Sequence, residues 1–246
     1  MSWVQIVLVV VGVIVLIVVL VELPPQHRFI DAAGNPDVEK LSKWLEKGRD
    51  PNRPGFLGLT ALGAAVTEAH PQNVKLLLVH GADPNQRSVK QLPLQCAMEK
   101  ANLEIVTDLL DAGADPLLPG MLNVSPIEEA ATSGKIDILR VFLDRGADAN
   151  GKVSRGQTLL MAVVLTLSGT RNDDEKQALR KVVQLLLDRG ASPNTRSQDD
   201  VPLLMAALND PPTLRMVVDS GAITTVSYQG LDLEPSIREA LQSNDM

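Results

Sequence analysis

The residues that could carry catalytic chemistry are few and widely separated. His27, His70 and His80 lie far apart in the sequence, and Cys96 is the only cysteine. An acidic run at 173–175 could bind a metal ion, but acidic residues are also expected in the first turn of a helix. The sequence contains no Gly-rich phosphate loop, nucleophile elbow or His-x-x-x-His pair. It therefore predicts no catalytic residue, no metal site and no cofactor.

The composition favours small helices and argues against nucleic acid as a partner. Apolar residues make up 45% of the 246 residues, but only six are aromatic, so the core must consist mainly of Leu, Val, Ala and Met. The formal net charge is -7, whereas phosphate binding depends mainly on an excess of Lys and Arg. A single cysteine cannot form an intrachain disulfide, which excludes a small scaffold held together by disulfides.

Two short phrases return along the chain in a fixed register. "HGADPN" at 80–85 has variants around five other glycines, spaced 33, 32, 33, 44 and 31 residues apart. These glycines are Gly48, Gly81, Gly113, Gly146, Gly190 and Gly221. A second phrase, "TALGAA" at 60–65, returns 21 residues before the glycine in most repeats. A period near 33 residues indicates a stack of repeated supersecondary units.

Each repeat is predicted to hold two antiparallel helices and a turn. Thr60 and Ser125 occupy positions where a hydroxyl can cap the first helix. The glycine can end the second helix in a left-handed conformation. The fifth repeat carries eleven extra residues within 165–183, where we expect Gly169 to end the first helix and Asn172 or Asp173 to cap a longer second helix. This insertion either carries recognition or is only an extended helical pair.

These phrases resemble the ankyrin repeat, whose pattern is close to T-P-L-H-x-A followed by a second helix and G-A-D-P-N. The match covers residues 27–225. The resemblance implies an all-α solenoid of stacked helix-turn-helix repeats with finger-like turns. The family's histidine is absent, and the residues in its place are Ile30, Gly63, Gln95, Glu128, Met161 and Leu204. The resemblance implies that the hydrogen bonds of that histidine are lost, so we expect a less regular array.

The predicted organisation is an N-terminal transmembrane anchor at 1–25 and a repeat domain at 26–246. The six predicted repeats and the C-terminal cap are 27–52, 53–85, 86–118, 119–150, 151–194, 195–225 and 226–246. Charged residues in the first repeat and a polar-faced helix after the last one would give the ends of the stack a solvated surface.

Residues 4–23 predict a single membrane span. The stretch 4–21 carries no charge, and about 20 apolar residues suffice to cross a bilayer as a helix. A cleaved signal peptide is the alternative, but "MSW" has no basic residue and no small-residue cleavage pattern follows. Arg28, Lys40 and Lys43 follow the span, so the positive-inside rule places the repeat domain in the cytoplasm. A periplasmic or extracellular domain is the alternative.

In an ankyrin-like stack, the turns between repeats would form a row of fingers along a concave face. The basic finger residues are Arg53, Arg87, Lys90, Lys152, Arg155 and Arg196, against only Asp199 and Asp200. The apolar finger residues are Phe56, Leu57, Met121, Leu122 and Val153. Basic charge around an apolar patch predicts a protein partner with an acidic surface. Alternatively, some of these side chains fold under neighbouring fingers.

The sequence thus predicts a membrane-anchored protein-protein interaction module. It would serve as a scaffold, subunit or assembly factor of a membrane complex. The alternative is an inhibitor or immunity-type antidote that covers a toxin or enzyme. Two more remote alternatives are an enzyme with a site in the 165–183 insertion and a self-assembling structural protein.

Overall fold

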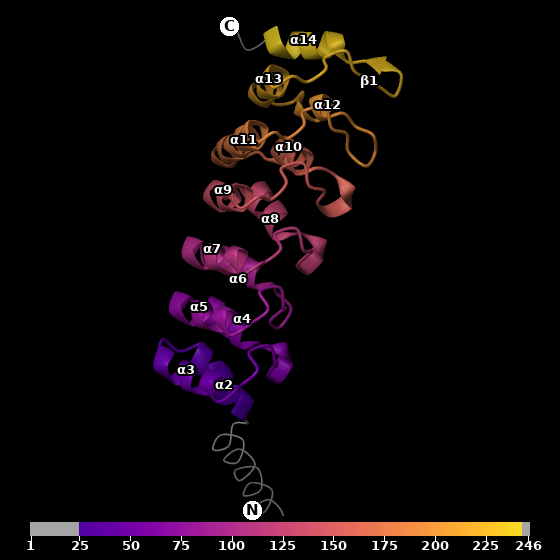
Figure 1. Ribbon diagram of the computed structural model, residues 1–246. Coiled ribbons are helices and arrows are strands. Elements are labelled where there is room, and N and C mark those ends of the chain that lie inside the picture. Colours follow the sequence, from indigo (N-terminus) through magenta and orange to yellow (C-terminus); the bar gives the residue numbers. More distant parts are fainter. Residues whose placement is uncertain (1–24, 243–246) are drawn as a thin grey trace, which may run out of the picture. The chain divides into compact units, whose positions relative to one another are not determined.

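The structure is a computed structural model that describes residues 25–242 of the chain (Figure 1). The described chain forms two compact units, residues 25–100 and residues 101–242. The predicted membrane span at 4–23 lies outside the described residues. Within 25–242, no helix combines the length and apolarity that a membrane crossing requires.

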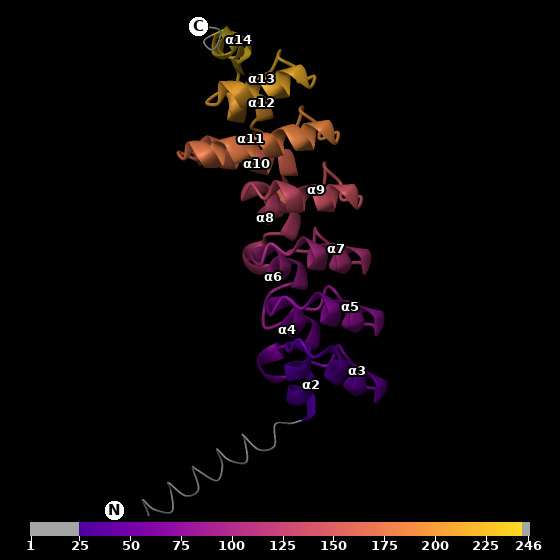
Figure 2. The ribbon, with the colours of Figure 1, turned by 90° about the vertical axis from the view of Figure 1, so that its left-hand side faces the viewer.

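The first unit consists of helical pairs joined by finger-like turns. Its elements are α2 (Pro25–Ala33), α3 (Val38–Glu46), the 3-10 turn η1 (Phe56–Gly58), α4 (Ala61–Thr67), α5 (Pro71–Val79) and α6 (Pro93–Glu99). The first helices of the pairs, α2, α4 and α6, contact one another in series, and the second helices α3 and α5 also contact each other. Figure 2 shows these two rows of helices within the unit.

The second unit repeats this arrangement and ends in a small hairpin and a helix. Its elements are α7 (Leu103–Asp111), η2 (Met121–Asn123), α8 (Pro126–Thr132), α9 (Ile136–Asp144), η3 (Ser154–Gly156), α10 (Leu159–Gly169), α11 (Asp173–Asp188), α12 (Leu203–Ala207), α13 (Pro211–Asp219), β1 (Ser227–Tyr228), β2 (Leu231–Asp232) and α14 (Glu234–Gln242). The first helices α8, α10 and α12 contact in series, as do the second helices α7, α9, α11 and α13. The strands pair antiparallel, and α14 packs on α13.

Local sequence signals begin and end these helices as predicted. The hydroxyl oxygens of Thr60, Ser125 and Thr158 accept hydrogen bonds from backbone N–H groups in the first turns of α4, α8 and α10. These bonds satisfy donors that have no partner inside the helix. At the ends of second helices, Gly81 and Gly146 have φ of 85° and 87°, a left-handed conformation that glycine adopts without a Cβ clash.

The core lies between the two rows of helices in each unit. Small side chains of the first helices, such as Ala65 and Ala130, are fully buried and allow close packing. Leu77 of α5 and Leu139 of α9, in the second helices, are also fully buried. With few aromatic residues available, aliphatic side chains supply nearly all the buried apolar surface that stabilises the stack.

Other side chains supply hydrogen bonds where the family pattern has its histidine. Both carboxylate oxygens of Glu128 accept from Ser154, one from its N–H at 3.0 Å and the other from its hydroxyl. Beside Gly63, the Ser88 hydroxyl accepts from the N–H of Thr60 at 3.1 Å, and a Cβ on Gly63 would lie 2.0 Å from that hydroxyl. At these two positions, different hydrogen bonds therefore take the place of those of the family histidine.

Asparagines at the ends of the glycine phrases tie successive loops together. Asn52 donates to the Gly81 carbonyl at 2.8 Å and accepts from the N–H of Asp83 at 2.7 Å. Asn150 makes the matching pair of bonds with Gly190 and Ser192, at 2.9 and 2.8 Å. The asparagine therefore does more than shape its own turn, because it satisfies one donor and one acceptor of the next repeat.

The insertion lengthens two helices and does not form a separate loop. α10 ends at Gly169, and Asn172 caps α11 by accepting from the N–H groups of Asp174 and Glu175. The added turns of α11 pack against the α8–α9 connection, where a Cβ on Gly134 would lie 3.0 Å from the Cβ of Ala178. The first helix ends at Gly169 and Asn172 caps the longer second helix, as the sequence predicts.

Candidate protein-binding surface

Each finger has a non-glycine residue with left-handed backbone geometry. In the first unit, Leu57 and Val89 have φ of 55° and 61°. In the second unit, Leu122, Arg155 and Asp200 have φ of 57°, 57° and 59°. Such residues are uncommon outside glycine, asparagine and aspartate, and a left-handed β-branched residue is an outlier. We call these five residues the fingertips; in Figure 1 the fingers project from the helical pairs.

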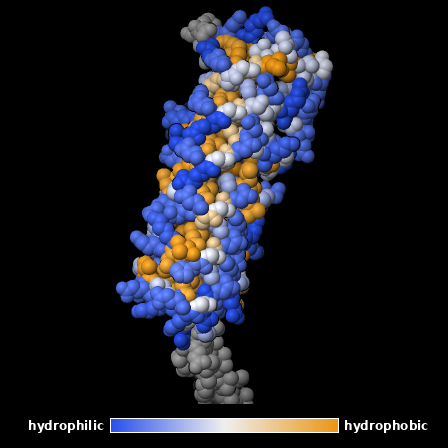
Figure 3. All heavy atoms as spheres, viewed as in Figure 1, coloured by the Kyte–Doolittle hydropathy of each residue, from blue (hydrophilic) through white to orange (hydrophobic). Residues whose placement is uncertain are grey.

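The apolar finger residues are exposed in both units. In the first unit, Phe56 is 70% exposed and Leu57 is 73% exposed. In the second unit, Leu122 is 94% exposed and Met121 is 47% exposed, whereas Val153 is half-buried. On the face drawn in Figure 3, apolar areas are separated by hydrophilic side chains. The exposed residues thus stand as local apolar spots beside polar surface.

The basic finger residues differ in the ion pairs and hydrogen bonds that their side chains form. Lys90, Lys152 and Arg155 are exposed, and their charged groups form no ion pair or hydrogen bond within residues 25–242. Arg87 donates to the Lys90 carbonyl at 3.3 Å. Arg196 pairs with Asp200 at 3.1 Å, so its finger presents less positive charge than the sequence suggests. The exposed side chain of Arg53 also makes no ion pair in the described chain.

A groove in the second unit lies between two fingers and the first helices. Its volume is about 630 Å³. The fingers contribute Leu122 and Arg155, and helices α8 and α10 contribute Glu128, Leu165 and Thr166. Leu165, which is 40% exposed, was not among the predicted site residues. The groove combines aliphatic and charged groups, as specific binding sites do.

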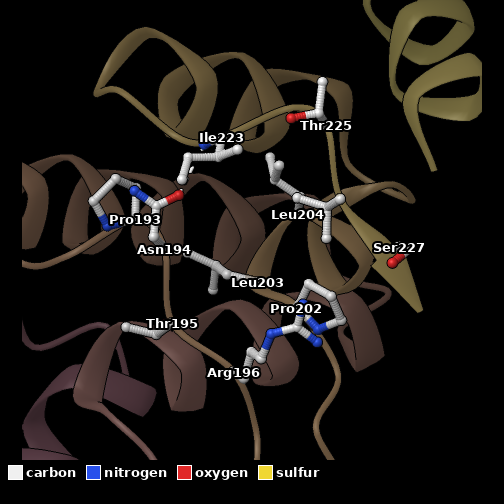
Figure 4. A pocket seen from close by; sticks show the side chains of 11 residues that line it. Pro193, Asn194, Thr195, Arg196, Pro202, Leu203, Leu204, Ile223, Thr225 and Ser227 are labelled. Carbon is white, nitrogen blue, oxygen red and sulfur yellow. Dashed lines mark hydrogen bonds between the residues drawn. The ribbon is translucent and has the colours of Figure 1, made fainter. Parts of the chain in front are cut away.

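A smaller hollow of about 290 Å³ lies near the end of the second unit (Figure 4). Leu203 and Leu204 of α12 and Ile223, from the loop after α13, line it. Leu204 stands where the family pattern has its histidine, so an aliphatic side chain borders this hollow. Arg196 also lines it, and its charge is already paired with Asp200.

The residues that could carry catalytic chemistry do not come together. Cys96 is buried, and burial together with the negative charge of Glu99 raises the pKa of its thiol. The Nδ1 atom of His80 lies 2.8 Å from the Leu76 carbonyl at the end of α5. The acids at 173–175 are exposed in the first turn of α11. Within residues 25–242, no group of His, Cys, Asp and Glu has an arrangement that could hold a metal ion.

The sequence and the fold are similar to those of known ankyrin-repeat proteins. Residues 29–119 match the family model described as ankyrin repeats (3 copies). The chain is 31% identical over 190 residues to human Ankyrin repeat and SOCS box protein 6. It is 28% identical over 121 residues to Ankyrin repeat, SAM and basic leucine zipper domain-containing protein 1 of Ovis aries. The alignments cover 70% and 49% of this chain but only 45% and 24% of the two relatives.

Solved structures of ankyrin-repeat domains also resemble this chain in fold. The ankyrin repeat domain of Bcl-3 superposes with a TM-score of 0.72 at 22% identity, covering 87% of this chain and 96% of that domain. An ankyrin repeat domain from Acinetobacter baumannii AYE gives a TM-score of 0.68 at 23% identity, covering 79% and 98%. Ankyrin repeats are protein-protein interaction modules, as the sequence predicts. The chain therefore has the all-α ankyrin-repeat fold, and residues 29–119 match the ankyrin-repeat family in sequence as well.

Proposed function

We propose that this chain is a membrane-anchored binding module that holds a partner protein with an acidic surface. Residues 4–23 would form the anchor, and Arg28, Lys40 and Lys43 favour a cytoplasmic repeat domain through the positive-inside rule. The module would act as a scaffold, subunit or assembly factor of a membrane complex. Its fingers, shaped before the partner arrives, would lose little conformational entropy on binding.

One observation carries this proposal. The fingers bear both cations that form no ion pair within the described chain and apolar side chains that are exposed. Lys152 and Arg155 have no ionic partner within the described chain, and Leu57 and Leu122 are largely exposed. Charge of one sign steers a complementary partner, and apolar side chains add affinity once water is excluded. An acidic protein surface with aliphatic residues matches both features.

The proposal is tested by affinity capture from membranes with the tagged full chain. A finger variant carries Lys90→Glu, Lys152→Glu and Arg155→Glu. We expect proteins captured by the unmodified chain to be depleted at least about tenfold with this variant, because like-charge juxtaposition across an interface costs several kcal/mol. Quantitative mass spectrometry of the captured proteins measures the effect.

The matched control reverses three exposed cations on second helices, Lys75→Glu, Arg140→Glu and Lys181→Glu. It changes the net charge by the same amount and should capture the partner normally. Equal capture by all three proteins would refute the role of the finger cations. Protease treatment of sealed vesicles tests the sidedness separately: digestion of the repeat domain from the extracytoplasmic side would overturn the cytoplasmic orientation.

A further inference from the structure

We propose that the groove of the second unit binds an extended segment of the partner through one aliphatic side chain next to a carboxylate. The groove is the one formed by Leu122, Arg155, Glu128, Leu165 and Thr166. This inference rests on the proposed function and specifies the chemistry that the fingers recognise.

The first apolar wall is Leu122, whose conformation is costly in the free protein. Its φ of 57° places a leucine in the left-handed region, and its side chain is 94% exposed. Left-handed geometry is disfavoured for residues with a Cβ, and exposure leaves the side chain without apolar contacts. A ligand that covers Leu122 would provide the burial that the free protein does not.

The second apolar wall is Leu165, which stands at a position where three other repeats have polar residues and the last repeat has Leu208. Counted from the capping residue of each first helix, Leu165 corresponds to Thr67 in α4, Glu99 in α6 and Thr132 in α8. It is 40% exposed. Leu165 therefore offers an aliphatic contact within the groove.

The charges in the groove select a carboxylate. Glu128 is only 6% exposed, and both of its carboxylate oxygens accept hydrogen bonds from Ser154. The exposed guanidinium of Arg155 has no ion pair within residues 25–242. Because Glu128 is buried and held by Ser154, the exposed charged group of the groove is the Arg155 guanidinium, and a guanidinium can bind a carboxylate through two parallel hydrogen bonds. An aspartate or glutamate beside the aliphatic residue satisfies Arg155.

A displayed library of random dodecapeptides, selected on the full chain in detergent, tests this inference. We expect enriched sequences to pair Leu, Ile or Val with a neighbouring Asp or Glu. A fluorescein-labelled copy of the most enriched peptide then reports Kd by anisotropy. Leu165→Thr and Leu122→Asn should each weaken binding by about tenfold to 100-fold, the effect of losing a buried leucine side chain. Arg155→Gln should also reduce the salt dependence of Kd.

Val79→Thr is the control for an exposed apolar side chain away from the groove, because Val79 is 83% exposed at the end of α5. It should leave Kd within about twofold of the unmodified chain, since Val79 does not line the groove. Circular dichroism of each variant verifies folding, and asparagine accepts the left-handed conformation well.

The failure of this inference is distinguishable from failure of the proposed function. Peptides that bind Leu122→Asn and Leu165→Thr normally, or that lack an acid, would overturn the groove assignment. An absence of enriched peptides would do the same. In those cases, if capture from membranes is lost with the finger variant, the proposed function as a protein-binding module is still supported. Conversely, the finger variant could capture the same proteins as the unmodified chain while peptide binding still depends on the groove. That result would refute only the proposal that the finger cations bind an acidic partner surface.

Discussion

At the scale of single residues, Asp210 shows how a charge can be buried without loss of stability. It is 5% exposed at the start of α13 and accepts from Arg180 Nε at 3.0 Å and from the N–H of Thr213 at 3.2 Å. Burial alone would raise the pKa of Asp210, but these hydrogen bonds outweigh burial and hold the pKa below its ordinary value. The pair ties α11 to α13.

This geometry predicts an acid-sensitive contribution to stability. Because the pKa of Asp210 is lower in the folded state, its contribution is complete above the unfolded-state pKa of about 3.9 and is lost as the pH falls further. We expect Asp210→Asn to lower the free energy of unfolding by about 2 kcal/mol at pH 7 and by clearly less at pH 3. Urea denaturation at both values measures this.

The control for the acid effect is Asp199→Asn, an exposed finger position. Its free energy of unfolding should follow that of the unmodified chain at both pH values. If Asp210→Asn lost the same stability at pH 3 as at pH 7, the ion pair would not be the source of the acid sensitivity.

At the scale of elements, the fit between a finger and a helix depends on a missing side chain. Gly63 lies in α4, and a Cβ there would lie 2.1 Å from the Ser88 Cβ. Alanine favours a helix over glycine by about 1 kcal/mol, so helix propensity alone predicts that Gly63→Ala stabilises. We expect the opposite, a loss of about 2 kcal/mol, because overpacking forces the finger away from the helix.

Two further variants separate packing from propensity. Ser88→Gly combined with Gly63→Ala should recover part of the lost stability, since the clashing atoms are removed. Gly169→Ala, at the end of α10, has no heavy atom within 4 Å of the added Cβ and should be neutral or stabilising. Thermal unfolding of the set would contradict this account if Gly63→Ala were as stable as the unmodified chain.

The elements were largely predictable because their signals are local. Thr60, Ser125 and the repeated glycines mark helix ends through hydrogen bonds and φ angles that involve only neighbouring residues. The candidate surface was less predictable, since it depends on contacts between elements. The sequence does not reveal that Ser88 fills the space beside Gly63. Nor does it reveal that Asp200 neutralises Arg196, although the two lie four residues apart.

Some missed features did leave a sequence signal. Leu165 could have been found by aligning the seventh positions after the capping residues of the first helices, where three other repeats have threonine or glutamate. The loop-bridging role of Asn52 and Asn150 could have been suspected from their return at the end of the glycine phrase. The left-handed conformations of Leu57, Val89, Leu122 and Arg155 had no such signal, because these residue types do not favour positive φ, whereas Asp200 is of a type that does.

At the scale of the whole molecule, stability is expected to be local. Each unit is compact, and its helices contact mainly those of adjacent repeats, as in other repeat proteins. Cys96, the only cysteine, lies in the first unit and is 6% exposed with a raised pKa. Alkylation requires an accessible thiolate, so its rate reports local opening of that unit.

We expect iodoacetamide to alkylate Cys96 in the folded full chain at least about 100-fold more slowly than in urea. This factor corresponds to a free energy of local opening of about 2.7 kcal/mol. Leu77→Ala in the first unit should speed the reaction, because truncating a buried leucine costs about 2–5 kcal/mol. Leu139→Ala, equally buried in the second unit, is the comparison and should leave the rate nearly unchanged. Equal acceleration by both variants would show that the units open together.

The fingertips have a consequence for how such a protein can diverge. Leu57, Leu122 and Arg155 share φ values of 55°, 57° and 57° although their side chains differ in size and charge. In the first two of these fingers, a glycine N–H donates across the turn at 2.8 Å, so the bend does not depend on the tip side chain. Single substitutions at these positions can therefore change the surface that a finger presents while the helices beneath it stay as they are.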